Sequence, residues 1–332
     1  MTIGKASNFV VYQNELRGGI VETLTQASNY FNQAGGAISL STISRRGDYA
    51  KETFFKNIAN VVSRRDTTSV SAATALPLTM DEIISVKLNR KFGPVDQTYD
   101  AFAKVAMDMD PGEFSMLLGG MIGKGMQVEM LNSGLRAARA ALANQASVLY
   151  TVPTSGTLNT AALVSGLSKF GDASNNVVAW VMHSKQFFDL MLHQIGTSAN
   201  GDIVSGVVVQ GANPLTLNRP VIVTDSAALT VAGGSGSGAF TDYYCLGLTA
   251  QGIAIENSEQ ERLVVQEVTG LENLVVRLQG EYAYNAGVKG FKWDIANGGG
   301  INPTDTNLGT GSNWDPAKTS FKDFAGVVIK SR

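Results

Sequence analysis

The chain has 332 residues, of which 44% are hydrophobic and only 16% are charged, with a formal net charge of −2. This length allows one large or two ordinary domains with a sizeable core. A mildly acidic balance argues against a dedicated nucleic-acid-binding protein, which is normally basic. Ordinary soluble domains carry about 25% charged residues, so we expect much of this surface to lie against other protein.

The sequence also argues against a disulfide, a signal peptide and a membrane span. The single cysteine, Cys245, excludes an intramolecular disulfide. The first residues, MTIGKASNFVVYQNELRGG, have no basic region followed by an apolar core, so we expect no signal peptide. No apolar run approaches the roughly 18 residues of a membrane span, and we expect no contact with a membrane.

The first hundred residues predict an extended arm over 1–44 and a long basic hairpin over 45–100. In the stretch IISVKLNRKFGPV, apolar Ile84, Val86 and Leu88 alternate with polar residues, as in a strand. The hairpin has too little apolar content for a core of its own, and an isolated hairpin is marginal in water. We therefore expect it to lie on other protein.

The strongest helix signal follows at MDPGEF. Asp110 is placed as the N-cap, Pro111 occupies the first helical position and Glu113 completes a capping box. From Phe114 to Leu149, steps of three and four residues give a nearly continuous apolar stripe. The pattern predicts one long spine helix over 111–149, rather than part of a compact pocket.

Residues 150–255 predict a mixed α/β unit. Helical patterns cover 159–171 and 184–196, and apolar strands are expected at 176–182, 219–225 and within 243–255. Two more strands, 262–268 and 273–288, precede a turn-rich tail.

The stretch GEYAYNAGVKGFKWD, residues 280–294, predicts a strand that changes face. Tyr282 and Tyr284 share one face, whereas after Gly290 the aromatic residues are Phe291 and Trp293. We expect the tyrosines to pack on the spine helix, Gly290 to form a bulge or kink, and the last two aromatics to hold the tail. This role is structural.

No catalytic, cofactor-binding or metal-binding constellation is predicted. His183 and His193 are the only histidines, and with one cysteine they offer no pair at zinc-ligand spacing. Ser184 beside His183 is better explained as a helix cap than as a nucleophile, because a triad needs groups converging from separate loops. We expect no enzyme activity and no cofactor.

Two oppositely charged segments are candidates for contacts between copies of the chain. Residues 45–91 carry a net charge of +4, and residues 256–272 carry a net charge of −4. Complementary charge of this kind sets register and partner choice. A solvated hairpin and other acidic partners remain open alternatives. The candidate inter-subunit residues are Arg45, Arg46, Arg64, Arg65, Lys87, Arg90, Lys91, Glu256, Glu259, Glu261, Glu267 and Glu272.

The order of these parts resembles the major capsid proteins of tailed double-stranded DNA bacteriophages with the Hong Kong 97-type fold. The phrases VVAWVMHSKQFFDLM, LNRPVIVTDS and VRLQGEYAYNAGVKGFKWD also resemble this family, and together with the element order they span the chain. The kind it most resembles is that of the epsilon-fifteen-like podophages.

The resemblance implies an α+β fold in five parts. These are an N-terminal arm (1–44), an extended β-hairpin loop (45–100), a peripheral domain with the spine helix (101–152), an axial α/β domain (153–258), and a return to the peripheral sheet with a C-terminal tail (259–332).

The same resemblance implies a late structural protein of the virion. Pentamers and hexamers would form an icosahedral shell around the DNA genome, which the chain would touch only non-specifically. The implied partners are a scaffolding protein, a portal at one vertex and a decoration or cementing protein, with assembly in the host cytoplasm. Two alternatives stay open: an encapsulin-type compartment shell, and a secreted β-rich binding protein.

Overall fold

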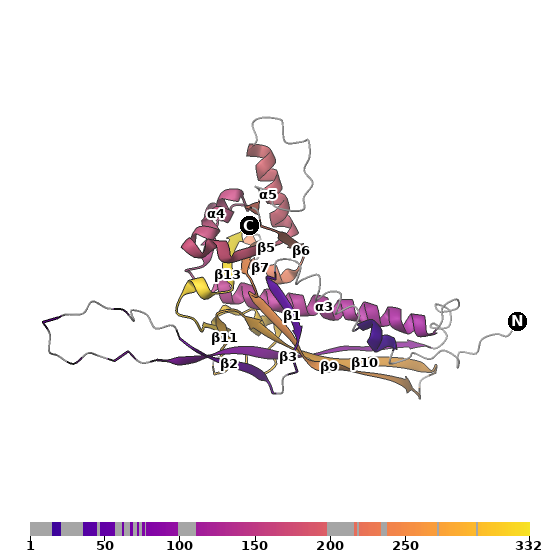
Figure 1. Ribbon diagram of the computed structural model, residues 1–332. Coiled ribbons are helices and arrows are strands. Elements are labelled where there is room, and N and C mark those ends of the chain that lie inside the picture. Colours follow the sequence, from indigo (N-terminus) through magenta and orange to yellow (C-terminus); the bar gives the residue numbers. More distant parts are fainter. Residues whose placement is uncertain are drawn as a thin grey trace.

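The structure is a computed structural model, and two sheets flank its long helix (Figure 1). Helix α3 (Pro111–Ala143) runs along one face of a five-stranded sheet, and a six-stranded sheet with two helices lies on the other side of α3. The structure describes residues 15–20, 36–44, 47–56, 62, 67–68, 72, 75–76, 78–98, 111–197, 216–217, 219–233, 238–270, 272–296 and 298–332.

The five-stranded sheet has the order β1-β9-β10-β3-β2. β9 and β3 run antiparallel to the central strand β10, β2 runs antiparallel to β3, and β1 runs parallel to β9. The strands are β1 (Ile38–Thr42), β2 (Tyr49–Phe55), β3 (Met80–Thr98), β9 (Ile253–Val268) and β10 (Val275–Val288). The predicted basic hairpin is therefore confirmed at its base, where β2 pairs with β3.

The six-stranded sheet is mixed, with the path β4-β13-β8-β5-β6 and β7 paired to β8. Its strands are β4 (Leu149–Thr151), β5 (Val177–His183), β6 (Val221–Thr224), β7 (Thr230–Gly233), β8 (Phe240–Thr249) and β13 (Gly326–Ser331). The helices α4 (Thr160–Ser168) and α5 (Ser184–Thr197) belong to this unit. All of these except β4, β7 and β13 match elements that the sequence predicts.

The last strand, β13, belongs to a different sheet from the one that the expected five-part division of the chain gives it. Residues 259–332 were expected in the other sheet and the tail, yet β13 pairs with β4 and β8 inside the six-stranded sheet. Val327, Val328 and Ile329 are fully buried there. The apolar run Val327–Ile329 was the available signal, because a short run apolar on both faces is typical of a buried strand.

The C-terminal chain forms a compact segment before it reaches β13. β11 (Phe291–Trp293) pairs with β12 (Trp314–Pro316), and the short helix α6 (Asp305–Leu308) lies between them in sequence. The indole Nε1 of Trp293 donates to the carbonyl of Gly300, and that of Trp314 donates to the carbonyl of Leu308. These bonds satisfy the two buried indole donors and hold the intervening turns.

The spine helix is real but ends six residues earlier than predicted, at Ala143. Leu149 forms β4 instead, because its backbone pairs with Val328 of β13. Pro111 and Glu113 lie in the first turn, whereas the predicted cap, Asp110, lies outside the described residues. A tertiary strand pairing thus overrides the local helical pattern at this end.

The first half of α3 does not bury the apolar stripe that the sequence predicts. Leu117, Met121 and Val128 are exposed, and the buried face carries small residues such as Ser115 and Gly119. A Cβ atom on Gly119 would lie 2.0 Å from the carbonyl oxygen of Leu16, in the helical segment 15–20. The small residues face inward because a second backbone passes too close for side chains.

A buried carboxylate ties the C-terminus into the six-stranded sheet. Asp242 of β8 forms ion pairs with Lys330 (2.7 Å) and Arg332 (2.9 Å). Burial raises the pKa of Asp242, but hydrogen bonds from both cations lower it, and the net effect holds the pKa below its usual range. A carboxyl with a depressed pKa stabilises the fold above its unfolded pKa, and this stability is lost as pH falls through the folded value.

We expect Asp242→Asn to flatten the acid limb of the stability profile. The wild-type chain should lose melting temperature between about pH 4 and pH 2, the range below the ordinary carboxyl pKa. The variant should be less stable at pH 7 and lose less on acidification, as thermal unfolding at a series of pH values would measure. An unchanged acid limb would show that other carboxylates carry the effect.

Candidate subunit interfaces

The aromatic face of β10 packs on the spine helix, as the sequence predicts. Tyr284 is fully buried, and its hydroxyl donates to Oγ of Ser133 on α3 at 2.8 Å. Its ring stacks on that of Tyr282, with centroids 6.0 Å apart. Burial is the main cause that raises the pKa of Tyr284 to about 12. Both phenols therefore act as neutral packing groups.

Gly290 turns the chain between β10 and β11. Its φ is +82°, and a Cβ there would lie 2.9 Å from the carbonyl oxygen of Asp323. Beyond it, the Phe291 ring packs on Phe324 (4.6 Å) and Trp293 packs edge-on against Trp314 (5.1 Å). The kink that the sequence predicts at Gly290 is confirmed, and the aromatic pair after it holds the C-terminal segment.

The charged candidates lie closer together than expected, and several pair within one chain. β9 and β3 flank β10, so the Nζ of Lys87 reaches a carboxylate oxygen of Glu259. Glu261 is buried and pairs with Arg17 at 2.9 Å. The sequence reveals opposite charge but not that both segments belong to one sheet. A role for these residues between copies stays a prediction.

The other charged candidates are distributed along the same sheet. Lys91 lies opposite Glu281 in the β3–β10 ladder, and Glu256 lies opposite Asn285 in the β9–β10 ladder. Glu267 is near the end of β9 and Glu272 follows it in the exposed turn before β10. Arg45, Arg46, Arg64 and Arg65 lie outside the described residues.

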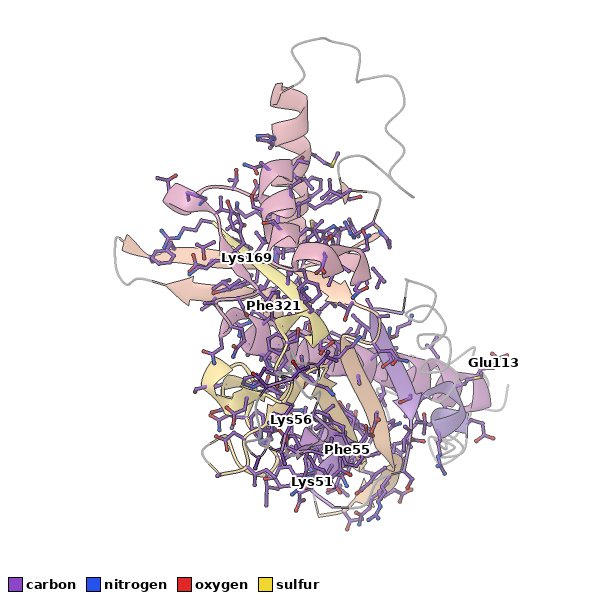
Figure 2. All side chains as sticks on the ribbon, turned by 60° about the vertical axis from the view of Figure 1, so that its left-hand side comes forward. Lys51, Phe55, Lys56, Glu113, Lys169 and Phe321 are labelled. Atoms are coloured by element: carbon purple, nitrogen blue, oxygen red, sulfur yellow. The ribbon has the colours of Figure 1, made fainter. Side chains whose placement is uncertain are left out.

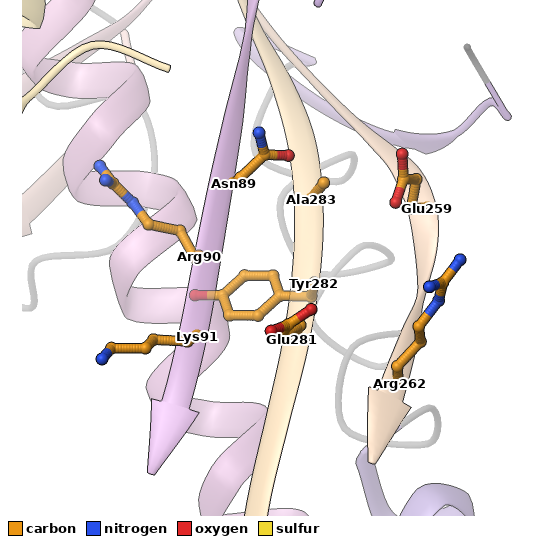
Figure 3. A pocket seen from close by; sticks show the side chains of 8 residues that line it. All are labelled: Asn89, Arg90, Lys91, Glu259, Arg262, Glu281, Tyr282 and Ala283. Atoms are coloured by element: carbon orange, nitrogen blue, oxygen red, sulfur yellow. The ribbon is translucent and has the colours of Figure 1, made fainter. Parts of the chain in front are cut away.

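A polar hollow of about 440 Å³ opens over the middle of these three strands (Figure 3). Asn89 and Lys91 of β3, Glu281 of β10, and Glu259 and Arg262 of β9 line it. Opposite charges alternate across the strands, which stabilises the sheet through cross-strand pairs. Arg90 and Tyr282 also contribute to the lining, so the charged side chains at the hollow are of both signs.

Arg90 belongs to the opposite face of β3, toward the spine helix. It pairs with Glu129 of α3 (3.0 Å) and with Asp305 of α6 (2.7 Å), and Arg136 of α3 also binds Asp305 (2.6 Å). This network joins sheet, spine helix and C-terminal segment. The alternation from Ile84 onward already put Arg90 on the apolar face, so the strand pattern contained the signal that net charge obscured.

Large exposed apolar side chains gather on the hairpin. Phe55 of β2 is 59% exposed and lies directly opposite Met80 of β3, which is 67% exposed (Figure 2). Leu76 and Leu78, which precede β3 in the sequence, are also more than half exposed. Exposed apolar patches of this kind mark protein contact sites. We call Phe55, Leu76, Leu78 and Met80 the hairpin patch.

Two helices carry further exposed apolar rows. On α3 these are Met116 and three members of the predicted apolar stripe, Leu117, Met121 and Val128. On α5, Phe188 and Leu192 are one helical turn apart and both at least 60% exposed. The three surfaces lie on different parts of the molecule, at the hairpin, the spine helix and the far end of the six-stranded unit.

His183, one of the two histidines, makes structural contacts within the six-stranded unit. Nδ1 of His183 accepts a hydrogen bond from the backbone N–H of Lys185 (3.2 Å), and its ring packs edge-on against Tyr243. Among the described residues, no cluster of three or more His, Cys, Asp or Glu could hold a metal ion. None of the described helices is both long and apolar enough to span a membrane.

Comparison with known proteins identifies the family. The model of the Gp13-like family, described as major capsid protein 13-like, matches residues 8–328. No curated protein sequence matches the chain. The chain belongs to the major capsid protein 13-like family and is a major capsid structural protein.

Solved phage structures share the fold at low sequence identity. A chain of the cyanophage Pam1 capsid asymmetric unit is 13% identical, with a TM-score of 0.51 over 90% of this chain and 89% of that one. A chain of Microbacterium phage Oxtober96 is 11% identical, with a TM-score of 0.51 over 88% of this chain and 89% of that one. The fold is the Hong Kong 97-type α+β capsid fold that the resemblance of the sequence implies.

Proposed function

We propose that copies of this major capsid protein assemble through pentamers and hexamers into an icosahedral shell that encloses double-stranded DNA. The observation that carries the proposal is the hairpin patch. Phe55 and Met80 form one rung of a two-stranded ladder, and both side chains are more than half exposed. A hairpin that exposes apolar side chains of this kind is stabilised when another copy covers them.

The three exposed surfaces divide the proposed contacts among the parts of the fold. The hairpin patch on the loop 45–100 and the outer stripe of α3 in the peripheral domain 101–152 would contact neighbouring copies around the body. Phe188 and Leu192 of α5 would contact copies around the capsomer axis, through the axial domain 153–258. In this division β13 joins the axial domain, while the rest of 259–332 stays with the peripheral sheet. Within the arm 1–44, β1 and the segment 15–20 lie against the same chain, so the proposed contact with a neighbour falls to the rest of the arm.

The proposed shell would have four kinds of partner: a scaffolding protein, a portal, a decoration protein and the packaged DNA. A scaffolding protein would guide assembly in the host cytoplasm, a portal would occupy one vertex, and a decoration protein would bind the outside. Packaged DNA would meet the shell without sequence-specific contacts, because a net charge of −2 offers little phosphate affinity. We place the chain with the epsilon-fifteen-like podophages and assign it no enzyme activity or cofactor.

Electron microscopy of the purified chain, alone and expressed with a scaffolding and portal protein, tests the proposal. Large shells with one portal vertex, or isolated pentamers and hexamers, are the expected result. Small shells without a portal would favour an encapsulin-type compartment. A monodisperse monomer under both conditions would contradict assembly and favour a binding protein.

A further inference from the structure

The C-terminal segment grips the base of the hairpin at one carboxylate. Asp81 of β3 forms ion pairs with Lys56, which directly follows β2 (2.9 Å), and with Lys292 of β11 (3.3 Å). Oδ1 of Asp81 also accepts a hydrogen bond from the backbone N–H of Glu82 at 2.8 Å. One side chain thus connects both sides of the hairpin to a strand more than two hundred residues away in sequence.

A second contact from the C-terminal segment holds the same pair of residues, on the β2 side. Phe54 is the register partner of Asp81 in the β2–β3 ladder. The Nζ of Lys318 lies 3.3 Å from the centroid of the Phe54 ring, within the distance at which a cation is attracted to an aromatic face. Lys318 is positioned by the C-terminal segment, where the backbone N–H of Ala317 donates to the carbonyl of Gly290 at 2.9 Å.

These contacts lie near the point where the hairpin leaves the sheet. The pair of Phe54 and Asp81 is the last but one rung in the described ladder, before Phe55 and Met80. In the described part of the sheet β2 is the edge strand, and β3 is its one neighbour there. A two-stranded ribbon is marginal without support, and the direction of a ribbon follows from where its last supported rung is held.

We propose that the segment 291–318 is a clamp that sets the direction in which the hairpin leaves the body, through Lys292 on Asp81 and Lys318 on Phe54. Asp81 is its central group because it binds both the hairpin's own Lys56 and the clamp's Lys292. The side chain of Asp81 is only 16% exposed, so solvent screens these pairs less than ordinary surface ion pairs. The clamp is a property of the single chain and does not depend on shell formation.

The surrounding charges determine how the clamp responds to acid. Lys56 and Lys292 face Asp81 directly. Glu82 on the next rung pairs with Lys51 (3.4 Å), and Asp315 lies opposite Lys292 in the β11–β12 ladder. Burial raises the pKa of Asp81, whereas hydrogen bonds from Lys56, Glu82 and Lys292 lower it, and the net direction is downward. The clamp is therefore closed at neutral pH and opens as pH falls through the folded pKa of Asp81.

Hydrogen exchange of the full-length unassembled chain tests the clamp. In Asp81→Asn, amides of 47–56 and 78–87 are expected to exchange about tenfold faster at pH 7, because local opening costs less free energy. The matched control is Asp96→Asn, which removes another ion pair of β3, with Arg277 at 2.6 Å, near the strand's other end. The control should leave the hairpin base unchanged.

Two further variants keep the test decisive if Asp81→Asn does not fold. Lys292→Met and Lys318→Ala each remove one half of the clamp and should accelerate exchange at the same amides. Lys292→Met should add little in an Asp81→Asn background, since both changes break one ion pair. Wild-type exchange at the hairpin base in these variants, or equal acceleration at the base in Asp96→Asn, would overturn the proposal.

Discussion

Aspartate in place of Phe55 and Met80 is expected to abolish shell assembly while each chain stays folded. Both side chains are already exposed in the single chain, at 59% and 67%, so the fold loses little when they become polar. A neighbouring copy that buries them would gain about 1.5–3 kcal/mol for each side chain. Placing two carboxylates in that contact replaces this gain with a desolvation cost.

The measurement is the fraction of protein in shells or capsomers, by sedimentation and negative-stain microscopy, beside circular dichroism for folding. Val164→Asp is the matched control, because Val164 is 50% exposed but belongs to α4, outside the three proposed surfaces and both charged segments. The double variant should lose at least about 100-fold in association, equivalent to roughly 3 kcal/mol. Assembly at the wild-type level would remove the hairpin patch from the proposed contacts.

Gly290→Ala is expected to destabilise the folded chain by about 3 kcal/mol. Part of this cost is backbone strain, because φ is +82° and an alanine rarely adopts that conformation. The other part is crowding, since the new Cβ would lie 2.9 Å from the carbonyl oxygen of Asp323 and 3.0 Å from the Cα of Phe324. Backbone atoms cannot move aside as a flexible side chain can, so the β10–β11 turn must shift.

Gly270→Ala separates the two contributions. Gly270 has a φ of +89°, and no heavy atom lies within 4 Å of the place that a Cβ would take, so its alanine variant adds strain without crowding. Urea unfolding of the unassembled variants should show a loss of about 1–2 kcal/mol for Gly270→Ala and clearly more for Gly290→Ala. Equal losses of unfolding free energy would mean that the segment around Asp323 and Phe324 moves to make room for the new Cβ. Glycine would then be required at position 290 only for its positive φ.

The alternation of side chains along a strand was a better guide to residue positions in this protein than the pattern of charge. Continued by one step, the alternation through Ile84, Val86 and Leu88 puts Arg90 on the face that packs on the helix, where it binds Glu129 and Asp305, although net charge suggested a contact between copies for it. Net charge instead suggested contacts between copies for Lys87 and Glu259, which pair within the chain. Total charge carries no information about which strands are neighbours, whereas side-chain alternation follows from the backbone itself.

The sequence by itself determined the hairpin, the spine helix, the tyrosine face of β10 and the kink at Gly290. Each of these rests on a local property: alternation, helical spacing, or a glycine at the point where the apolar residues of a strand change face. Only the tertiary structure decided that α3 turns Gly119 inward against Leu16, that Leu149 leaves the helix to pair with Val328, and that Lys292 meets Asp81. These depend on contacts between residues more than a hundred positions apart, whose energies no local pattern contains, so they override propensity wherever a distant backbone or charge comes within reach.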